Sequence, residues 1–149
     1  MKNENESSKT HLTEPIPMTL DPSSQQSVPQ TIAQLLQQAI AHHQSGQLLQ
    51  AGELYQTILQ SQPNHPEVNF NLGVIAVQVQ QPAAGLPYFM AALDADPSCG
   101  KYWLNYIDAL FQAGQPEEAR AVIRHLKGFE PKVAAQLERE TGLAVGNLI

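Results

Sequence analysis

Apolar side chains recur at helical spacing through most of the chain. Between Ile32 and Ile40 the large apolar residues stand at positions 32, 35, 36 and 40, a spacing that places them on one face of a helix. Gly46 then permits a turn, and a second apolar series runs from about Leu48 to Gln60. This pattern predicts two helices joined by a tight turn.

The same pattern returns with a period of 34 residues. Proline stands at positions 63, 97 and 131, glutamine at 47, 81 and 115, and a bulky residue at Tyr55, Phe89 and Ile123. Several independent series at one period indicate internal repeats. We therefore divide residues 28–133 into three helix–turn–helix units, 32–65, 66–99 and 100–133.

Both ends of the chain differ from the repeats. Residues 1–27 are polar and show no helical period, so we expect a disordered N-terminal tail. Residues 132–149 are expected to form a helix to about Thr141, followed by a C-terminal tail. Such a helix would cap the apolar face of the last repeat, which a solenoid must cover.

Prolines mark two details within the second unit. Asn64 or His65 is expected to cap a helix that begins near Pro66, a favoured first-turn residue. Pro87 instead lies inside the next predicted helix, where proline costs about 3 kcal/mol. Either that helix begins late, near Ala84, or it is kinked, and both alternatives stay open.

Composition and charge narrow the class of partner. Hydrophobic residues make up 42% of the chain, enough for a core, and the formal net charge is -6. From Val28 to Gly100 there is no lysine or arginine, whereas nucleic acids and anionic membranes are bound through these residues. We therefore expect neither nucleic acid nor membrane as a partner. With a single cysteine, Cys99, and no apolar signal segment, the sequence favours a cytoplasmic protein.

The residues that usually carry catalysis are not arranged for it. None of the five histidines forms a metal-binding pair, and there is no glycine-rich phosphate loop and no Gly-x-Ser-x-Gly motif. We therefore expect a protein that is not an enzyme and that needs no cofactor or metal.

The 34-residue helix–turn–helix period resembles the tetratricopeptide repeat. In the second unit the resemblance rests on Leu72-Gly73, Gly85 and Pro97, and in the third on Trp103 and Gly114. It implies an all-α fold, a right-handed superhelix (an α-solenoid) of three repeats with a capping helix at the C-terminal end.

A narrower resemblance concerns short sequence segments within the repeats. Gly85-Leu86-Pro87-Tyr88-Phe89 and Tyr102-Trp103-Leu104 are similar to the N-terminal repeats of bacterial glycosyltransferases of the O-linked N-acetylglucosamine transferase type. This resemblance implies an alternative role, in which the repeats dock substrates for a larger enzyme.

The family resemblance also implies where a ligand binds. In this family the first helix of each pair lines a concave groove, and an asparagine ladder there contacts the backbone of an extended peptide. The matching row here is Gln37, Asn71 and Asn105, whose amides can donate and accept hydrogen bonds at once. The other candidate peptide-binding residues are Gln44, Gln78 and Gln112, together with Phe70, Val74, Lys101, Asp108 and Phe111.

Two alternatives to this groove stay open. Glutamine is abundant in the chain, so its row can be compositional, and the apolar rows can belong to the helix-packing core. A carboxylate clamp of lysine and arginine, which some family members carry, is not favoured because only Lys101 stands at a matching position. The sequence thus predicts a non-catalytic scaffold that binds a protein or an extended peptide, with self-association into a homodimer as a further alternative.

Overall fold

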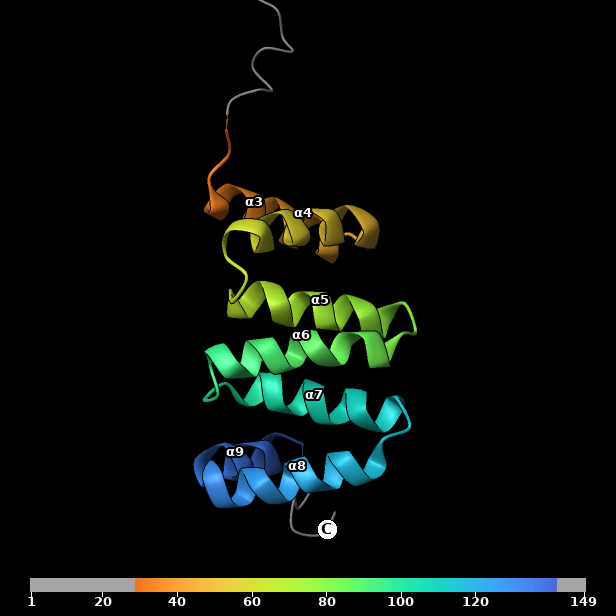
Figure 1. The fold of residues 1–149 in the computed structure, drawn as a ribbon, viewed down its shortest axis with the longest axis vertical. Helices are drawn as coiled ribbons and strands as arrows, with labels where there is room; N and C mark the ends of the chain where they lie inside the picture. Colours follow the sequence, from red (N-terminus) through yellow and green to blue (C-terminus); the bar gives the residue numbers. More distant parts are fainter. Residues whose placement is uncertain (1–28, 142–149) are drawn as a thin grey trace, which may run out of the picture. The chain divides into compact units, whose positions relative to one another are not determined.

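The computed structural model describes residues 29–141, and in this range it contains seven α-helices and no strand (Figure 1). The helices are α3 (Ile32–Gln44), α4 (Leu48–Ser61), α5 (Pro66–Gln78), α6 (Pro82–Ala95), α7 (Gly100–Gln112), α8 (Pro116–Phe129) and α9 (Pro131–Thr141). All seven belong to one compact unit that begins at Ile32. The expected N-terminal tail, residues 1–27, and the expected C-terminal tail lie outside the described residues.

The helices pack as three antiparallel hairpins followed by a single helix. The hairpins are α3–α4, α5–α6 and α7–α8, and each hairpin contacts the next in chain order (Figure 1). The final helix, α9, packs against α7 and α8 and buries Val133, Ala134 and Leu137 against the last repeat. The predicted all-α solenoid is therefore confirmed. No helix in the described part of the chain is both long and apolar enough to cross a membrane.

The row of bulky residues at the 34-residue period supplies the centre of the core. Tyr55 and Phe89 are fully buried, and Ile123 is 1% exposed. Each belongs to a different core cluster, so every hairpin contributes one large side chain at the same place. Burial of such side chains contributes about 1.5–3 kcal/mol each, which is why the spacing is regular.

The turns inside the three hairpins share one backbone conformation. Gly46 and Gly114 both have φ +78°, and the corresponding turn of the second hairpin places Gln80 at φ 65°. An amide N–H one residue later then bonds back into the preceding helix, as Gln81 N does to Ala76 O at 2.8 Å. The second turn therefore adopts a left-handed conformation that favours glycine without having one.

Side chains at a shared repeat position fix the loops between hairpins. Asn69 is 3% exposed, and its amide donates to the carbonyl oxygens of Pro63 and His65, both at 3.0 Å. One period later, Trp103 Nε1 donates to Pro97 O at 2.7 Å. Two different residue types thus perform the same task, which is to hold the loop proline against the next helix.

The helix starts follow the proline signals. His65 caps α5, because its ring Nδ1 accepts a hydrogen bond from Val68 N at 3.3 Å, and Pro66 takes the first helical position. The alternative of a late start for α6 is wrong, since α6 begins at Pro82 and continues through Pro87. Pro87 removes one backbone bond, to Ala83, and both residues are exposed, so water can satisfy the released carbonyl group.

Candidate functional site

A cavity of about 460 Å³ opens between the first helices of the first two hairpins. Helix α3 contributes aliphatic and polar side chains, α5 contributes an acid and two amides, and α4 contributes one tyrosine. The lining residues are Ile40, His43, Gln44, Tyr55, Glu67, Asn71 and Gln78. The lining of the cavity is thus mainly polar, and the cavity lies on the helices that the family resemblance assigned to the groove.

A hydrogen-bonded chain crosses this cavity from α4 to α5. His43 Nε2 lies 2.8 Å from Gln78 Oε1, and Tyr55 OH lies 3.5 Å from His43 Nδ1. Because an amide oxygen only accepts, His43 Nε2 carries the proton and donates it. With the proton on Nε2, Nδ1 is the acceptor for the Tyr55 hydroxyl, and the two rings meet edge to face with their centroids 6.1 Å apart. These contacts orient His43 and Gln78 at the wall.

The electrostatics of the cavity are set by one carboxylate. Glu67 is the only acidic residue in the lining, which contains no lysine or arginine. Burial, and secondly the negative charge of Glu67, raise the pKa of Tyr55 to about 12. Tyr55 therefore stays protonated and remains a donor, and the site favours a neutral or cationic ligand group over an anionic one.

The structure brings some of the sequence-predicted site residues together. Gln44, Asn71 and Gln78 line the cavity, as do Ile40, one period before Val74, and His43, two periods before Phe111. Gln37 belongs to the same helix α3 and is exposed, but it does not line this cavity.

The predicted residues of α7 lie one hairpin further along, outside this cavity. Asn105 Nδ2 donates to Lys101 O at 2.9 Å, and Gln112 Nε2 donates to Asp108 Oδ2 at 2.6 Å. These amide groups are engaged within their own helix, although each keeps acceptor capacity on its oxygen. Phe111 is 39% exposed. A ligand that reaches α7 must therefore extend beyond the cavity.

Phe70, Val74 and Lys101 occupy different environments. Phe70 is only 6% exposed and stacks on Tyr102 at 4.8 Å, so its ring belongs to the core. Val74 is partly buried and packs against the same cluster. Lys101 is exposed, and its Nζ lies 4.8 Å from the centre of the Phe70 ring, a cation–π contact. For Phe70 the structure thus matches the alternative of packing core.

Two lining residues were missed by the sequence reasoning. Glu67 stands 34 residues before Lys101, so the row that contains Lys101 carried the signal. Tyr55 belongs to the bulky core row and does lie in the core, but it also lines the cavity, where its hydroxyl lies 3.5 Å from His43 Nδ1. Among the described residues no group of three or more His, Cys, Asp or Glu could hold a metal ion.

Comparison with known protein families gives a match to part of the chain. Residues 70–132 match the sequence model of a family described as tetratricopeptide repeat. No curated protein matches the sequence.

Similar solved structures share the fold. MamA (MSR-1) aligns with a TM-score of 0.60 and 21% identity, over 89% of this chain and 76% of that chain. The Yersinia enterocolitica type III secretion chaperone SycD, in complex with a peptide of the translocator YopD, aligns with a TM-score of 0.64 and 17% identity, over 81% and 91%. The Thermobaculum terrenum O-GlcNAc transferase aligns with a TM-score of 0.59 and 24% identity, over 67% of this chain and 19% of that chain.

Proposed function

We propose that this chain, whose residues 70–132 match the tetratricopeptide repeat model, is a non-catalytic scaffold that binds an extended peptide segment of a partner protein. The cavity between α3 and α5 carries the proposal, because it combines three amide side chains with the aliphatic side chain of Ile40. Amides satisfy the peptide groups of a ligand without selecting its side chains. The resemblance to the family supports a position for such a peptide along the first helices of the hairpins.

The charge of the cavity defines which peptides suit it. Glu67 would repel a C-terminal carboxylate, and the lining contains no lysine or arginine to neutralise one. An internal segment of a protein, with neutral or basic side chains at this point, fits better than a free acidic C-terminus. A similar solved structure, SycD, is in complex with a peptide, which is the class of ligand that we propose.

A capture experiment with matched variants tests this function. The full chain is immobilised as wild type, as the Asn71→Ala/Asn105→Ala double variant, and as Asn64→Ala. Asn64 is exposed in the loop before α5 and does not line the cavity, so it controls for the loss of an asparagine. Proteins captured from a lysate are quantified by mass spectrometry.

The expected result is a partner that wild type and Asn64→Ala retain equally. Each lost hydrogen bond costs about 0.5–1.5 kcal/mol, so two lost bonds lower the affinity of the double variant roughly five- to a hundredfold. Equal retention by all three proteins would remove the asparagines from the binding site and overturn the groove as its location.

A second candidate function is the docking of substrates for a glycosyltransferase. The observation that favours it is the alignment with the Thermobaculum terrenum O-GlcNAc transferase, of which this chain spans 19%. The test is the reading frame of the gene: a frame that continues past Ile149 into a catalytic domain would support docking. A stop codon directly after Ile149 would refute it.

The cytoplasm is the compartment that we propose for this function, because the single cysteine, Cys99, is a free thiol. Fractionation of cells that produce the chain, with immunodetection of each fraction, tests the location.

A further inference from the structure

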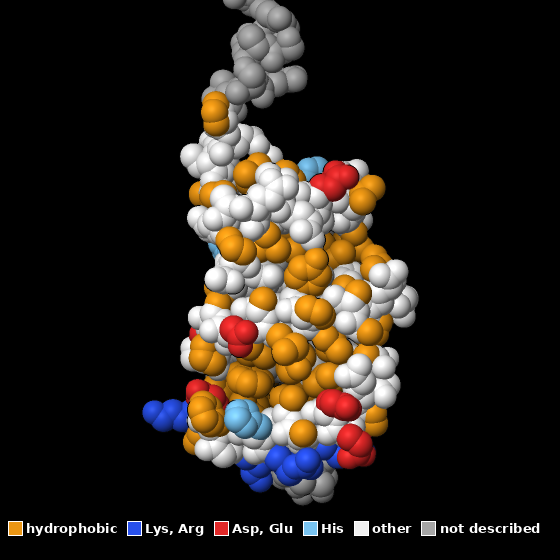
Figure 2. Space-filling model, in the orientation of Figure 1, with side chains coloured by type: hydrophobic (Ala, Val, Ile, Leu, Met, Phe, Trp, Pro, Cys, Tyr) orange, Lys and Arg blue, Asp and Glu red, His pale blue; other side chains and the backbone are white. Residues whose placement is uncertain are grey.

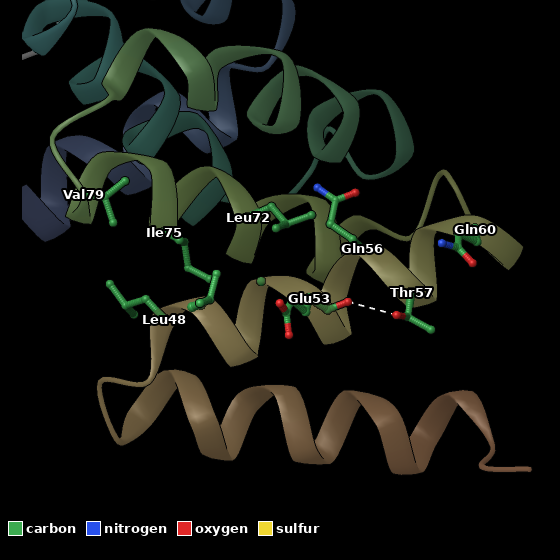
Figure 3. A pocket seen from close by; sticks show the side chains of 10 residues that line it. Leu48, Glu53, Gln56, Thr57, Gln60, Leu72, Ile75 and Val79 are labelled. Carbon is green, nitrogen blue, oxygen red and sulfur yellow. Dashed lines mark hydrogen bonds between the residues drawn. The ribbon is translucent and has the colours of Figure 1, made fainter. Parts of the chain in front are cut away.

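A larger cavity, of about 580 Å³, opens between α4 and α5. It shares no lining residue with the cavity between α3 and α5. Figure 3 shows Leu48 of α4 and Ile75 of α5 on its two sides. The wall is mainly aliphatic, with polar side chains along α4. The lining residues are Leu48, Leu49, Gly52, Glu53, Gln56, Thr57, Gln60, Leu72, Ile75 and Val79. We call this cavity the α4–α5 cleft.

A glycine in the wall leaves space in the α4–α5 cleft. Gly52 lines it, and a Cβ atom built on Gly52 would meet nothing within 4 Å. One period later the same position is Leu86, which is partly buried and packs against two core clusters. The second junction between hairpins is therefore filled by a leucine, whereas the first is left open.

Apolar surface continues from the cleft to the outside of the molecule. Leu49 is 73% exposed and Val79 is 45% exposed, and both line the cleft. Figure 2 shows hydrophobic side chains gathered over the middle of the repeat array on the face in view. Exposed apolar surface around a cavity is typical of an interaction site.

The charge around the cleft indicates the chemistry of its occupant. Glu53 is the only charged residue in the lining, and its region, Val28 to Gly100, contains no lysine or arginine. On the face in view, the lysine and arginine side chains gather toward the α8 end (Figure 2). A ligand with a basic side chain beside its apolar ones would therefore meet complementary charge at Glu53.

We propose that the α4–α5 cleft is a second docking site, which binds an amphipathic segment of a partner protein. The segment presents aliphatic side chains to Leu48, Leu72 and Ile75, and a lysine or arginine to Glu53. Its first aliphatic side chain takes the space above Gly52 that Leu86 fills one repeat later. Because the cleft and the groove have different linings, the two sites can be tested independently.

Selection of peptides on the full chain tests the proposal. The probe is a phage library of random peptides of 14 residues, the length of α4. Selected peptides are synthesised, and their affinities are measured by fluorescence anisotropy for wild type and variants. Gly52→Leu fills the cleft, and Gly128→Leu is its control, because Gly128 lies in α8 with open space at its Cβ.

The expected peptides carry aliphatic residues next to lysine or arginine. Their affinity falls about tenfold or more on Gly52→Leu, since an aliphatic contact is displaced, and is unchanged on Gly128→Leu. Glu53→Gln lowers it roughly two- to fivefold, the range for an exposed ion pair. Leu49→Ser serves as a second cleft variant that does not depend on core packing, because Leu49 is 73% exposed.

Three results would overturn the proposal. Peptides that bind Gly52→Leu and Leu49→Ser as tightly as wild type do not use the cleft. Peptides weakened only by Asn71→Ala/Asn105→Ala would support the groove and reject the cleft. A wild-type dimer in light scattering that Gly52→Leu converts to monomer would make a second copy of the chain the occupant.

Discussion

Helices α5 and α6 approach each other closely at Gly73 and Gly85, so a larger residue at either position should destabilise the fold. A Cβ atom on Gly85 would lie 2.8 Å from the carbonyl oxygen of Gly73 and 3.2 Å from the Cβ of Ala76. A Cβ atom on Gly73 would lie 2.7 Å from the ring of Phe89, which is fully buried. Neither the backbone oxygen nor the enclosed ring can move aside, so alanine at either position must push the helices apart.

The magnitude follows from comparison with Gly52, which is also helical but faces open space. Gly52→Ala gains only helix propensity, so it should raise the free energy of unfolding by about 0.5–1 kcal/mol. Gly85→Ala has the same gain and adds an overpacking cost of about 1–3 kcal/mol. The difference in stability between the two variants should therefore be about 1–3 kcal/mol, in favour of Gly52→Ala.

Urea unfolding followed by far-UV circular dichroism measures this difference. Gly128→Ala provides a second reference, because a Cβ atom there also meets nothing within 4 Å. In thermal unfolding the predicted gap corresponds to roughly 2–8 °C in Tm per kcal/mol. If Gly85→Ala were as stable as Gly52→Ala, the close approach of α5 and α6 would be refuted.

Three further predictions concern single side chains. Gln80→Gly relieves a left-handed backbone and should raise the free energy of unfolding by about 0.5–1 kcal/mol in urea unfolding, whereas a decrease would place Gln80 outside that conformation. Trp103→Phe keeps a ring but removes the hydrogen bond to Pro97 O, so the same assay should show a loss of about 0.5–1.5 kcal/mol, and no loss would contradict that bond. Because the pKa of Tyr55 is about 12 in the folded chain against 10 for an ordinary tyrosine, the unfolded state releases its proton first and stability falls as pH rises from 10 through 12. Tyr55→Phe should lessen that fall in unfolding midpoints measured across this pH range, and an unchanged fall would reject the assignment.

The fold could be predicted because prolines and glycines mark where most of the helices begin and turn. Prolines open α5, α6, α8 and α9, and glycines form two of the three hairpin turns. The turn of the second hairpin could not be foreseen, because Gln80 has no intrinsic preference for the left-handed conformation. It is imposed there by the helices on either side, which carry tertiary contacts that a local pattern does not contain.

The site could be predicted only in part, because a row of residues defines a helix face but not the depth of each side chain. Gln44, Asn71 and Gln78 could be predicted because they lie on the faces that α3 and α5, two neighbouring first helices, turn toward the same cavity. Phe70 stands in an apolar row of the same helices, yet Tyr102 covers its ring from the next hairpin. The α4–α5 cleft could not be predicted from Gly52 alone. A glycine leaves space in the wall only where the side chains of α5 opposite do not fill it.

The α4–α5 cleft also has a consequence for the order in which the hairpins unfold. In a linear array each hairpin is held only by its neighbours, and at the N-terminal end of the described array α3–α4 has a single neighbour, α5–α6. That one interface contains the α4–α5 cleft, whereas the α6–α7 interface is filled by Leu86. Separation of α3–α4 thus breaks fewer apolar contacts than separation at α6–α7, and amide hydrogens of the first hairpin should exchange with solvent sooner. A segment bound in the α4–α5 cleft would contact both hairpins across this interface. Binding should therefore make the first hairpin unfold together with the rest of the array.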